Sequence, residues 1–255
     1  LQILKQNGET IQKGIVRDFP RYENRGFMLD VGRKFFTMDY LKQYVKILSF
    51  YKMNEFQIHL NDNGFPQFFG DDWNRTYAAF RLESERFPGL TAKDGSYSKQ
   101  EFIDLQRMGL EYGVRIIPEI DIPAHSLAFA HYKPEIASRK YGMDHLDLYK
   151  KETYQFVDSL LDEYLSGDNP VFIGDLHIGT DEYNKKEAEQ YRYFTDRYLK
   201  FVEKYGKNVR MWGGLKWLPG KTPVKAEGVT VNAWSYDWVD PVVSLQEGYK
   251  LINTC

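Results

Sequence analysis

The feature that most constrains the fold is a regular alternation of short apolar segments with longer amphipathic ones. In residues 40–51, apolar side chains recur at i, i+3 and i+4, which is the spacing of one helix face. Residues 114–120 are almost continuously apolar, as in parallel strands buried on both faces. This alternation predicts βαβ units around a parallel sheet. The predicted strands are residues 27–31, 55–60, 114–120, 171–179, 209–212, 229–234 and 250–253.

Local signals support the remaining predicted helices. Ser98 with Glu101 fits a capping box, and Gly113 is a stop signal for the helix between them. Further helices are predicted over residues 152–165 and 187–205. Residues 61–97 are rich in Asp, Asn and Gly and are expected to form a polar loop, and a second long loop follows residue 120.

Polar residues at the carboxyl ends of successive predicted strands favour a (β/α)₈ barrel over a doubly wound sheet. A barrel gathers all of these ends into one ring, whereas a doubly wound sheet brings together only those at its switch point. The length of 255 residues is also close to the ~250 of a typical barrel. The strand-end residues are Asp62, Asp121, His125, Asp181, Glu182, Trp212 and Trp234.

The domain prediction assigns residues 21–255 to the barrel. The barrel is expected to be incomplete as given, because the seventh predicted strand is cut at Cys255 and no eighth strand is present. Residues 1–20 do not fit the barrel pattern and are interpreted as the tail of a preceding domain plus a linker.

Charge and composition exclude some classes of function. The formal net charge of −2 gives no basic field for nucleic acid, and no run of ~18 apolar residues could span a membrane. Cys255 is the sole cysteine, which excludes an internal disulfide framework. Aromatic residues reach 16%, most of them expected in the core and a few beside a sugar.

The segment that ends in Asp181 and Glu182 carries the strongest catalytic signal. Two adjacent acids can simply favour a helix N-terminus, but here they follow an apolar strand of the predicted barrel. Neighbouring strand residues point to opposite faces, so this pair is poorly placed to flank one glycosidic bond as acid and nucleophile. One carboxyl is instead expected to protonate the leaving oxygen, while the other stabilises a nucleophile supplied by the substrate, such as an N-acetyl group.

The motifs resemble the β-N-acetylhexosaminidases of glycoside hydrolase family 20. The resemblance runs in the family's order from about residue 21 to the end of the chain. The most diagnostic segments are the one from Pro118 to His125 and the one from His177 to Glu182, and the two together are more specific than either alone. The matching segments are Arg25-Gly-Phe-Met-Leu-Asp-Val-Gly-Arg33, Lys52-Met-Asn-Glu-Phe-Gln-Ile-His59-Leu-Asn-Asp62, Pro118-Glu-Ile-Asp121-Ile-Pro-Ala-His125, His177-Ile-Gly-Thr-Asp181-Glu182, Met211-Trp212 and Val231-Asn-Ala-Trp234.

This resemblance implies removal of terminal β-linked N-acetylglucosamine or N-acetylgalactosamine, with retention and through an oxazolinium intermediate. Glu182 matches the general acid/base, whose pKa an aromatic pocket is expected to raise, and Asp181 matches the residue that holds the acetamido N–H. No cofactor or metal is implied, and secretion, the periplasm or the cell surface is the implied location. The other matching positions are Arg33 and Asp62 for sugar hydroxyls, Trp212 and Trp234 for the acetyl pocket, and Asp121, His125 and His177 as supporting groups.

Some positions depart from the family pattern. Thr180 replaces a glycine, Asn63 replaces a second acid, and Gly213 with Gly214 stand where an acid commonly follows the tryptophan. The family's tyrosine for the acetamido oxygen and a further tryptophan fall beyond Cys255. These departures concern sugar specificity more than the type of reaction.

Two alternatives from other classes of protein stay open. A metal-dependent barrel hydrolase would use His59, Asp62, His125, His177 and Asp181, although their spacing does not indicate zinc. A truncated or non-catalytic barrel would bind sugar without cleaving it, which the intact acid pair disfavours. A family 18 chitinase is disfavoured, because the catalytic acid of that family lies two residues beyond an Asp, whereas Glu182 directly follows Asp181.

Overall fold

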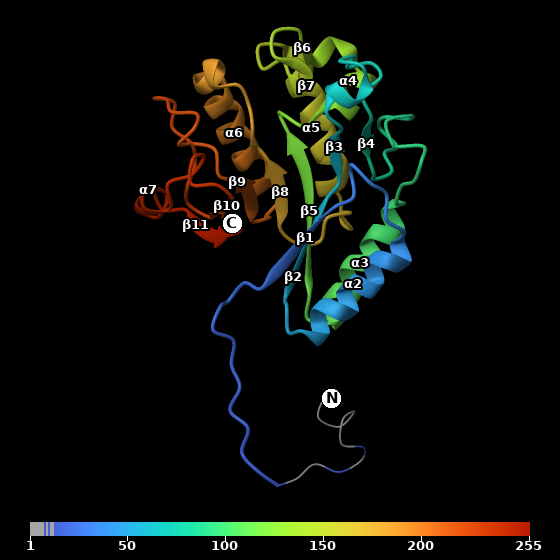
Figure 1. The fold of residues 1–255 in the computed structure, drawn as a ribbon, viewed down its shortest axis with the longest axis vertical. Helices are drawn as coiled ribbons and strands as arrows, with labels where there is room; N and C mark the ends of the chain where they lie inside the picture. Colours follow the sequence, from blue (N-terminus) through green and yellow to red (C-terminus); the bar gives the residue numbers. More distant parts are fainter. Residues whose placement is uncertain (1–7, 9, 11–12) are drawn as a thin grey trace.

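The computed structural model describes residues 8, 10 and 13–255, and a curved sheet of seven parallel strands forms its centre (Figure 1). Each strand pairs with the next of these strands along the chain. The register places Phe27 beside Phe56, and Phe56 beside Ile116. In order, the strands are β1 (Gly26–Asp30), β2 (Glu55–His59), β5 (Arg115–Ile122), β8 (Leu176–Gly179), β9 (Val209–Trp212), β10 (Val229–Ala233) and β11 (Lys250–Asn253).

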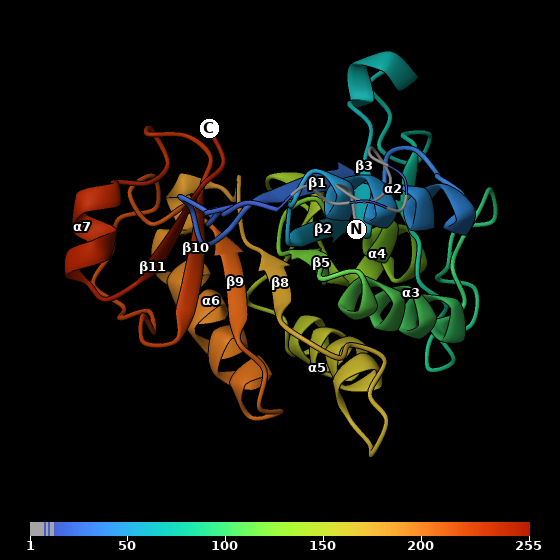
Figure 2. The same cartoon turned by 90° about the horizontal axis from the view of Figure 1, so that it is seen from below.

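Helices connect most of these strands, and Figure 2 shows α3, α5 and α6 along one side of the sheet. Leu41, Val45 and Leu48 form the buried face of α2, as their spacing predicts. Within the described residues β1 and β11 are the two edges of the sheet, so this part of the chain forms an incomplete (β/α)₈ barrel, which confirms the predicted fold class. The helices are α2 (Met38–Phe50), α3 (Lys99–Glu111), α5 (Lys151–Leu165), α6 (Ala188–Glu203) and α7 (Pro241–Gln246).

The predicted ends of α3 are confirmed. The Ser98 hydroxyl accepts a hydrogen bond from the Glu101 backbone N–H, and the Glu101 carboxylate accepts one from the Ser98 backbone N–H. Gly113 has a φ of 71°, the left-handed conformation that ends a helix at low cost in glycine. These local signals could be read from sequence because they depend on a few adjacent residues.

The prediction that residues 61–97 form a loop was wrong in part. They contain β3 (Asn61–Asn63), η1 (Pro66–Phe69) and β4 (Ala78–Phe80), and β3 pairs antiparallel with β4. The second long loop likewise contains α4 (Leu127–Tyr132), η2 (Pro134–Ile136), β6 (Ala137–Ser138) and β7 (Gly142–Leu146), which lie at the top of Figure 1. Such short elements contain too few residues to show a periodicity.

The fourth strand is shorter than predicted, because β8 begins at Leu176 rather than at residue 171. Val171 and Phe172 are buried in the core without joining the sheet. The backbone N–H of Phe172 donates to the Tyr164 carbonyl, and that of Ile173 donates to the Gln106 side chain. The apolar run therefore predicted burial correctly, but a bond to the backbone of α5 and a bond to the Gln106 side chain replace the pairing with a neighbouring strand.

A buried arginine fixes the segment that leads from β1 into the barrel mouth. Arg81 is fully buried and donates from Nε to the Val31 carbonyl at 2.7 Å and from Nη2 to the Gly32 carbonyl at 3.0 Å. Gly32 packs so closely on β3 that a Cβ there would lie 2.6 Å from the Asp62 backbone nitrogen. The next residue, Arg33, is thereby held at a fixed distance from Asp62.

The first part of the chain stays outside the barrel. Residues 13–25 contain no helix or strand, and Ile15, Val16 and Phe19 are exposed. Half of the segment interpreted as the tail of a preceding domain plus a linker, namely residues 1–7, 9 and 11–12, lies outside the described residues, so that assignment stays a prediction. None of the described helices is both long enough and apolar enough to cross a bilayer.

Candidate active site

A cavity of about 230 Å³ opens at the carboxyl ends of the strands. All of the predicted site residues except His177 line it. A larger cavity of about 400 Å³ lies between the edge strands β1 and β11 and shares Met28 and Trp212 with the first. The smaller cavity is lined by Met28, Asp30, Arg33, His59, Asp62, Asp121, His125, Asp181, Glu182, Trp212 and Trp234.

The acid pair follows β8 on a sharply turned backbone. The strand ends at Gly179, and Thr180 and Glu182 have φ angles of 80° and 52°. The left-handed region is costly for residues with a side chain, and such strain concentrates at functional sites. Our premise that Asp181 and Glu182 alternate as strand neighbours was therefore wrong, because the turn brings both carboxyls to one cavity.

Two buried contacts hold this turn in place. The backbone N–H of Thr180 donates to the Asp121 carboxylate at 3.2 Å, and its carbonyl accepts from the Tyr191 hydroxyl at 2.5 Å. A Cβ on Gly179 would lie 1.7 Å from Asp121 Oδ1, so only glycine allows β5 and β8 to approach this closely. Asp121 thus positions the backbone from which both acids project.

His125 connects the acid pair to Asp62. Its Nε2 lies 3.2 Å from Glu182 Oε2 and 3.6 Å from Asp181 Oδ2, and its Nδ1 lies 3.0 Å from Asp62 Oδ1. Burial alone would lower the pKa of His125, but the charges of Asp181 and Asp121 and the bond to Asp62 raise it well above its usual range. The charged imidazole is therefore hydrogen-bonded to Asp62 through Nδ1, while its Nε2 forms ion pairs with Glu182 and Asp181.

The expected rise in the pKa of Glu182 is not found in the unliganded protein. The hydrogen bond from His125 lowers the pKa of Glu182, and burial opposes this only weakly because the side chain is 49% exposed. Burial instead raises the pKa of Asp181 and, together with the charge of Asp181, raises that of Asp121 well above its usual range. These two carboxyls cannot easily both ionise, and the pKa of Asp121 is raised further than that of Asp181.

Arg33 bridges two aspartates at the other wall of the cavity. Its Nη1 lies 2.9 Å from Asp30 and 2.6 Å from Asp62, and its Nε donates to the Asn63 carbonyl at 3.0 Å. Burial disfavours the ionised form of Asp62, but bonds from His125 and His59 hold its pKa well below the usual range. The Arg33 side chain remains 38% exposed, which leaves part of the guanidinium free to bind hydroxyl groups.

Arg33→Ala is expected to raise KM for a substrate with hydroxyl groups at this wall by about 10- to 100-fold, the usual worth of a hydrogen bond to a charged group. The value of kcat should also fall if the contacts tighten in the transition state. Steady-state kinetics measures both effects. Arg33→Lys is the control, because lysine keeps the positive charge but lacks the planar guanidinium that can donate two parallel hydrogen bonds. A purely structural ion pair would instead produce an Arg33→Ala variant that fails to fold.

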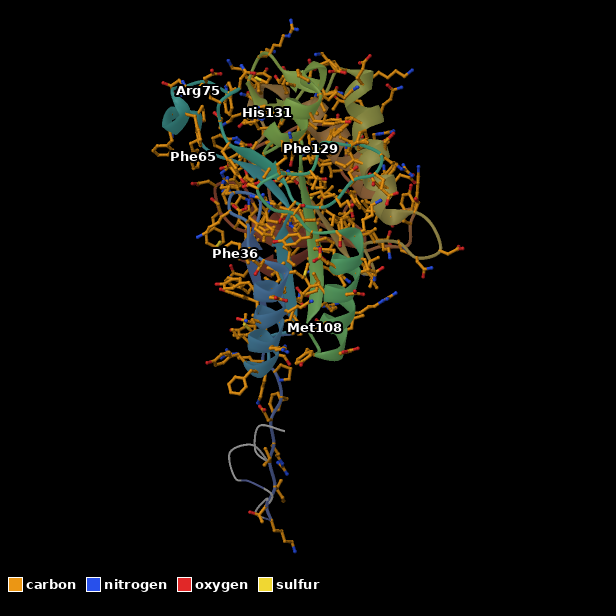
Figure 3. The ribbon with its side chains drawn as sticks, turned by 90° about the vertical axis from the view of Figure 1, so that its right-hand side faces the viewer. Phe36, Phe65, Arg75, Met108, Phe129 and His131 are labelled. Carbon is orange, nitrogen blue, oxygen red and sulfur yellow. The ribbon has the colours of Figure 1, made fainter. Side chains whose placement is uncertain are left out.

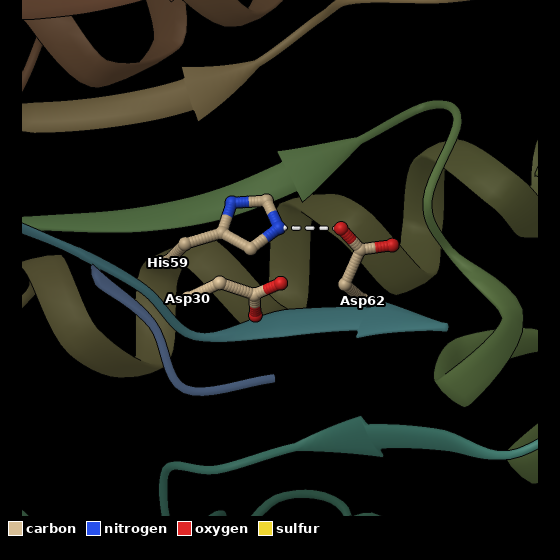
Figure 4. A group of neighbouring side chains, drawn as sticks. All are labelled: Asp30, His59 and Asp62. Atoms are coloured by element: carbon tan, nitrogen blue, oxygen red, sulfur yellow. Dashed lines mark hydrogen bonds and ion pairs between the residues drawn. The ribbon is translucent and has the colours of Figure 1, made fainter. Parts of the chain in front are cut away.

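Glu119 is a functional candidate that our sequence interpretation missed. It is fully buried and accepts from Trp212 Nε1 at 2.6 Å and from Gln57 Nε2 at 2.7 Å. Its Oε1 also lies 3.1 Å from His59 Nδ1, and His59 in turn donates to Asp62 (Figure 4). Burial opposes ionisation, yet His59 and His177 lower the pKa of Glu119 to about 2. The signal was available, because Glu119 shares a strand face with Asp121.

His177 supports the wall of the cavity rather than the acid. It is completely buried, and its ring lies 4.9 Å from that of Trp212. Burial lowers the pKa of His177 to about 4, and its Nδ1 accepts a hydrogen bond from the Gly179 N–H at 3.1 Å. The neutral ring therefore packs behind Trp212 and below the turn that carries the acids.

Trp234 continues outward into a row of aromatic rings that sequence reasoning also missed. Its ring centroid lies 5.3 Å from that of Trp238, which lies 4.9 Å from that of Trp217. The ammonium group of Lys185, in η3 (Lys185–Glu187), lies 3.8 Å from the centre of the Trp217 ring. The row thus connects the cavity wall to the segment that follows Glu182.

Three groups of acids and histidines in the described residues are close enough to hold a cation. In the group of Asp30, His59 and Asp62 (Figure 4), the Arg33 guanidinium already contacts both carboxylates. The other groups centre on His59 and on His125, whose ring nitrogens all face carboxylates at 2.8 to 3.6 Å. Arg33, His59 and His125 thus lie between the carboxylates of these groups.

An acid pair and two indole rings around one small cavity, at the strand ends of a β/α barrel, are typical of an enzyme that breaks glycosidic bonds. The sequence motifs and this geometry both point to the class of enzymes that break glycosidic bonds. The fold and the cavity therefore resemble those of glycoside hydrolases.

Comparison with known proteins defines the family. The model of the glycosyl hydrolase family 20 catalytic domain matches residues 22–191, and the chain belongs to this family. It is 28% identical to a β-hexosaminidase of Akkermansia muciniphila over 89% of this chain and 50% of that protein. It is similar in structure to a Flavobacterium johnsoniae chitobiase, with a TM-score of 0.74 and 26% identity over 92% of this chain and 38% of the other.

A β-hexosaminidase of Streptomyces plicatus, solved as a mutant in complex with its product GlcNAc, is also similar, with a TM-score of 0.72 and 27% identity. That comparison covers 91% of this chain and 47% of the other. The chain spans half or less of the length of the curated relatives that it matches.

Proposed function

We propose that the full protein removes terminal β-linked N-acetylhexosamine from glycans, with retention of configuration and with the substrate's acetamido oxygen as nucleophile. The observation that carries this proposal is the shared position of Asp181 and Glu182 at one imidazole nitrogen, His125 Nε2. A protein nucleophile and an acid would have to lie on opposite sides of the bond, about 5 Å apart. Two acids that share His125 as their partner suit a substrate that brings its own nucleophile.

In this mechanism Glu182 protonates the leaving oxygen and later takes a proton from water. Asp181 accepts a hydrogen bond from the acetamido N–H and offsets the positive charge of the oxazolinium ring. Arg33 and Asp62 bind ring hydroxyls, while Trp212 and Trp234 enclose the acetyl group. Asp121, His125 and His177 support these groups through the contacts described above.

Substrate binding changes the surroundings that set the pKa of Glu182. A bound sugar excludes water from the half-exposed carboxylate, and loss of solvation raises the pKa of a carboxyl group. We infer that substrate binding, rather than the resting fold, brings Glu182 toward its protonated form. The proposed mechanism uses no cofactor or metal. By family resemblance, we place the protein outside the cytoplasm: secreted, in the periplasm or at the cell surface.

Nitrophenyl glycosides test this function on the full-length protein. Hydrolysis is expected with N-acetylglucosaminide or N-acetylgalactosaminide, and little or none with plain glucoside, which lacks the acetamido nucleophile. The same assays in EDTA should give unchanged rates. Equal turnover of the glucoside would contradict substrate assistance, and a loss in EDTA that zinc or manganese restores would favour the metal-dependent hydrolase.

A further inference from the structure

The cavity wall formed by Trp212 is held in place by a buried carboxylate. Trp212 is mostly buried and lines the cavity, and its Nε1 donates to Glu119 Oε1 at 2.6 Å. An indole ring has one hydrogen-bond donor and no acceptor. Rotation of the ring about its χ2 bond would carry this N–H away from Glu119, so the bond selects one orientation of the ring.

Glu119 is itself fixed by its neighbours. The register of the sheet places it beside His59 of β2 and beside His177 of β8. Its Oε1 lies 3.1 Å from His59 Nδ1, and its Oε2 accepts from Gln57 Nε2 at 2.7 Å. Because both oxygens have partners, the carboxylate has little freedom to move and gives the Trp212 ring a fixed point of attachment.

A carboxylate suits this position because Trp212 and Gln57 both present N–H groups to it. An ionised glutamate accepts hydrogen bonds on both oxygens and donates none. Glutamine has the same shape, but its amide NH₂ would have to face one of these two donors. One contact would therefore be lost, and a buried donor without a partner is costly.

We propose that Glu119 is a positioning residue that determines selectivity for the acyl group on the sugar nitrogen. By fixing the Trp212 ring, it gives the pocket a width that fits an N-acetyl group and excludes a longer acyl chain. The second indole, that of Trp234, is held independently, because its Nε1 donates to the Gly213 carbonyl at 2.9 Å. This inference rests on the proposed function, in which both indoles enclose the acetyl group.

Two substrates that differ by one methylene test this selectivity on the full-length protein. The quantity measured is the ratio of kcat/KM for nitrophenyl N-acetylglucosaminide to kcat/KM for its N-propionyl analogue. Both substrates carry the nucleophilic carbonyl oxygen, so the chemistry is the same. One methylene in a pocket is worth roughly 10- to 200-fold, so we expect a parental ratio of about 10 or more and a ratio of about 3 or less in Glu119→Gln.

Trp212→Phe removes the N–H through which Glu119 acts. It should also lower the ratio, and adding Glu119→Gln to it should lower the ratio no further. Glu163→Gln is the matched control on α5, which Figure 2 and Figure 3 show outside the sheet. The Glu163 side chain is 3% exposed, accepts from the Ser84 hydroxyl at 2.6 Å and pairs with Lys99 at 2.8 Å. Its loss should leave the ratio at the parental value.

Thermal unfolding establishes which variants are folded. If Glu119→Gln is not, Glu119→Asp replaces it with the same expected fall, because aspartate keeps the buried charge but draws the carboxylate back from the indole. A folded variant at position 119 that keeps the parental ratio would overturn the proposal. A parental ratio near one, or a double variant with a ratio well below that of Trp212→Phe, would also overturn it. A parent that hydrolyses neither substrate would refute the proposed function, and this inference with it.

Discussion

Glu182→Gln is expected to lower kcat/KM by about 10²- to 10⁴-fold on substrates with a poor leaving group, such as a disaccharide. The amide cannot donate a proton to the glycosidic oxygen, although it fills nearly the same space. A dinitrophenyl leaving group needs little protonation, so its first bond-breaking step should lose much less. Steady-state kinetics on both substrates measures the difference.

The control is Glu135→Gln, which changes an exposed glutamate on η2 that pairs with Lys133. It should leave both rates near those of the parent. Equal losses on both substrates in Glu182→Gln would show that Glu182 does not act as the general acid, whatever the size of the loss.

Asp181→Asn is expected to lower kcat by about 10²- to 10³-fold, the usual effect of removing one group that stabilises charge in the transition state. A neutral amide cannot offset the positive charge of the oxazolinium ring. The fold should survive, because the change relieves repulsion between two buried carboxyls and lets the pKa of Asp121 fall.

Thermal unfolding checks that the Asp181→Asn variant is folded, and kinetics on an N-acetylhexosaminide measures the loss. Asp168→Asn is the control, since Asp168 is exposed in the turn after α5. An Asp181→Asn variant that is folded and retains most of the parental kcat would contradict the role given to Asp181.

The sequence predicted the strands and the cavity well where short-range patterns determine them. Val209 to Trp212 and Lys250 to Asn253 are strands with the predicted ends, because apolar runs in a parallel sheet are bounded by polar turns. Residues from six strands converge on one cavity because a barrel gathers strand ends.

Properties that depend on packing could not be predicted. The left-handed backbone at Thr180 and Glu182 has no sequence signature, since neither residue is glycine, so we wrongly treated the acids as strand neighbours. The lowered pKa of Glu182 depends on the distance from His125, which is itself in the left-handed region with a φ of 53°. The role of Glu119 as common partner of Trp212 and His59 appears only once the curved sheet brings side chains of β2, β5 and β9 together.

The central claim is that the substrate's acetamido oxygen, and no side chain, attacks the anomeric carbon. The inhibition constant of the thiazoline that mimics the cyclic intermediate, compared with that of N-acetylglucosamine on the full-length protein, tests it most directly. Analogues of the transition state commonly bind about 10²-fold or more tighter than ground-state ligands, and we expect at least that ratio. Inhibition constants that are equal for the thiazoline and the free sugar would contradict the claim.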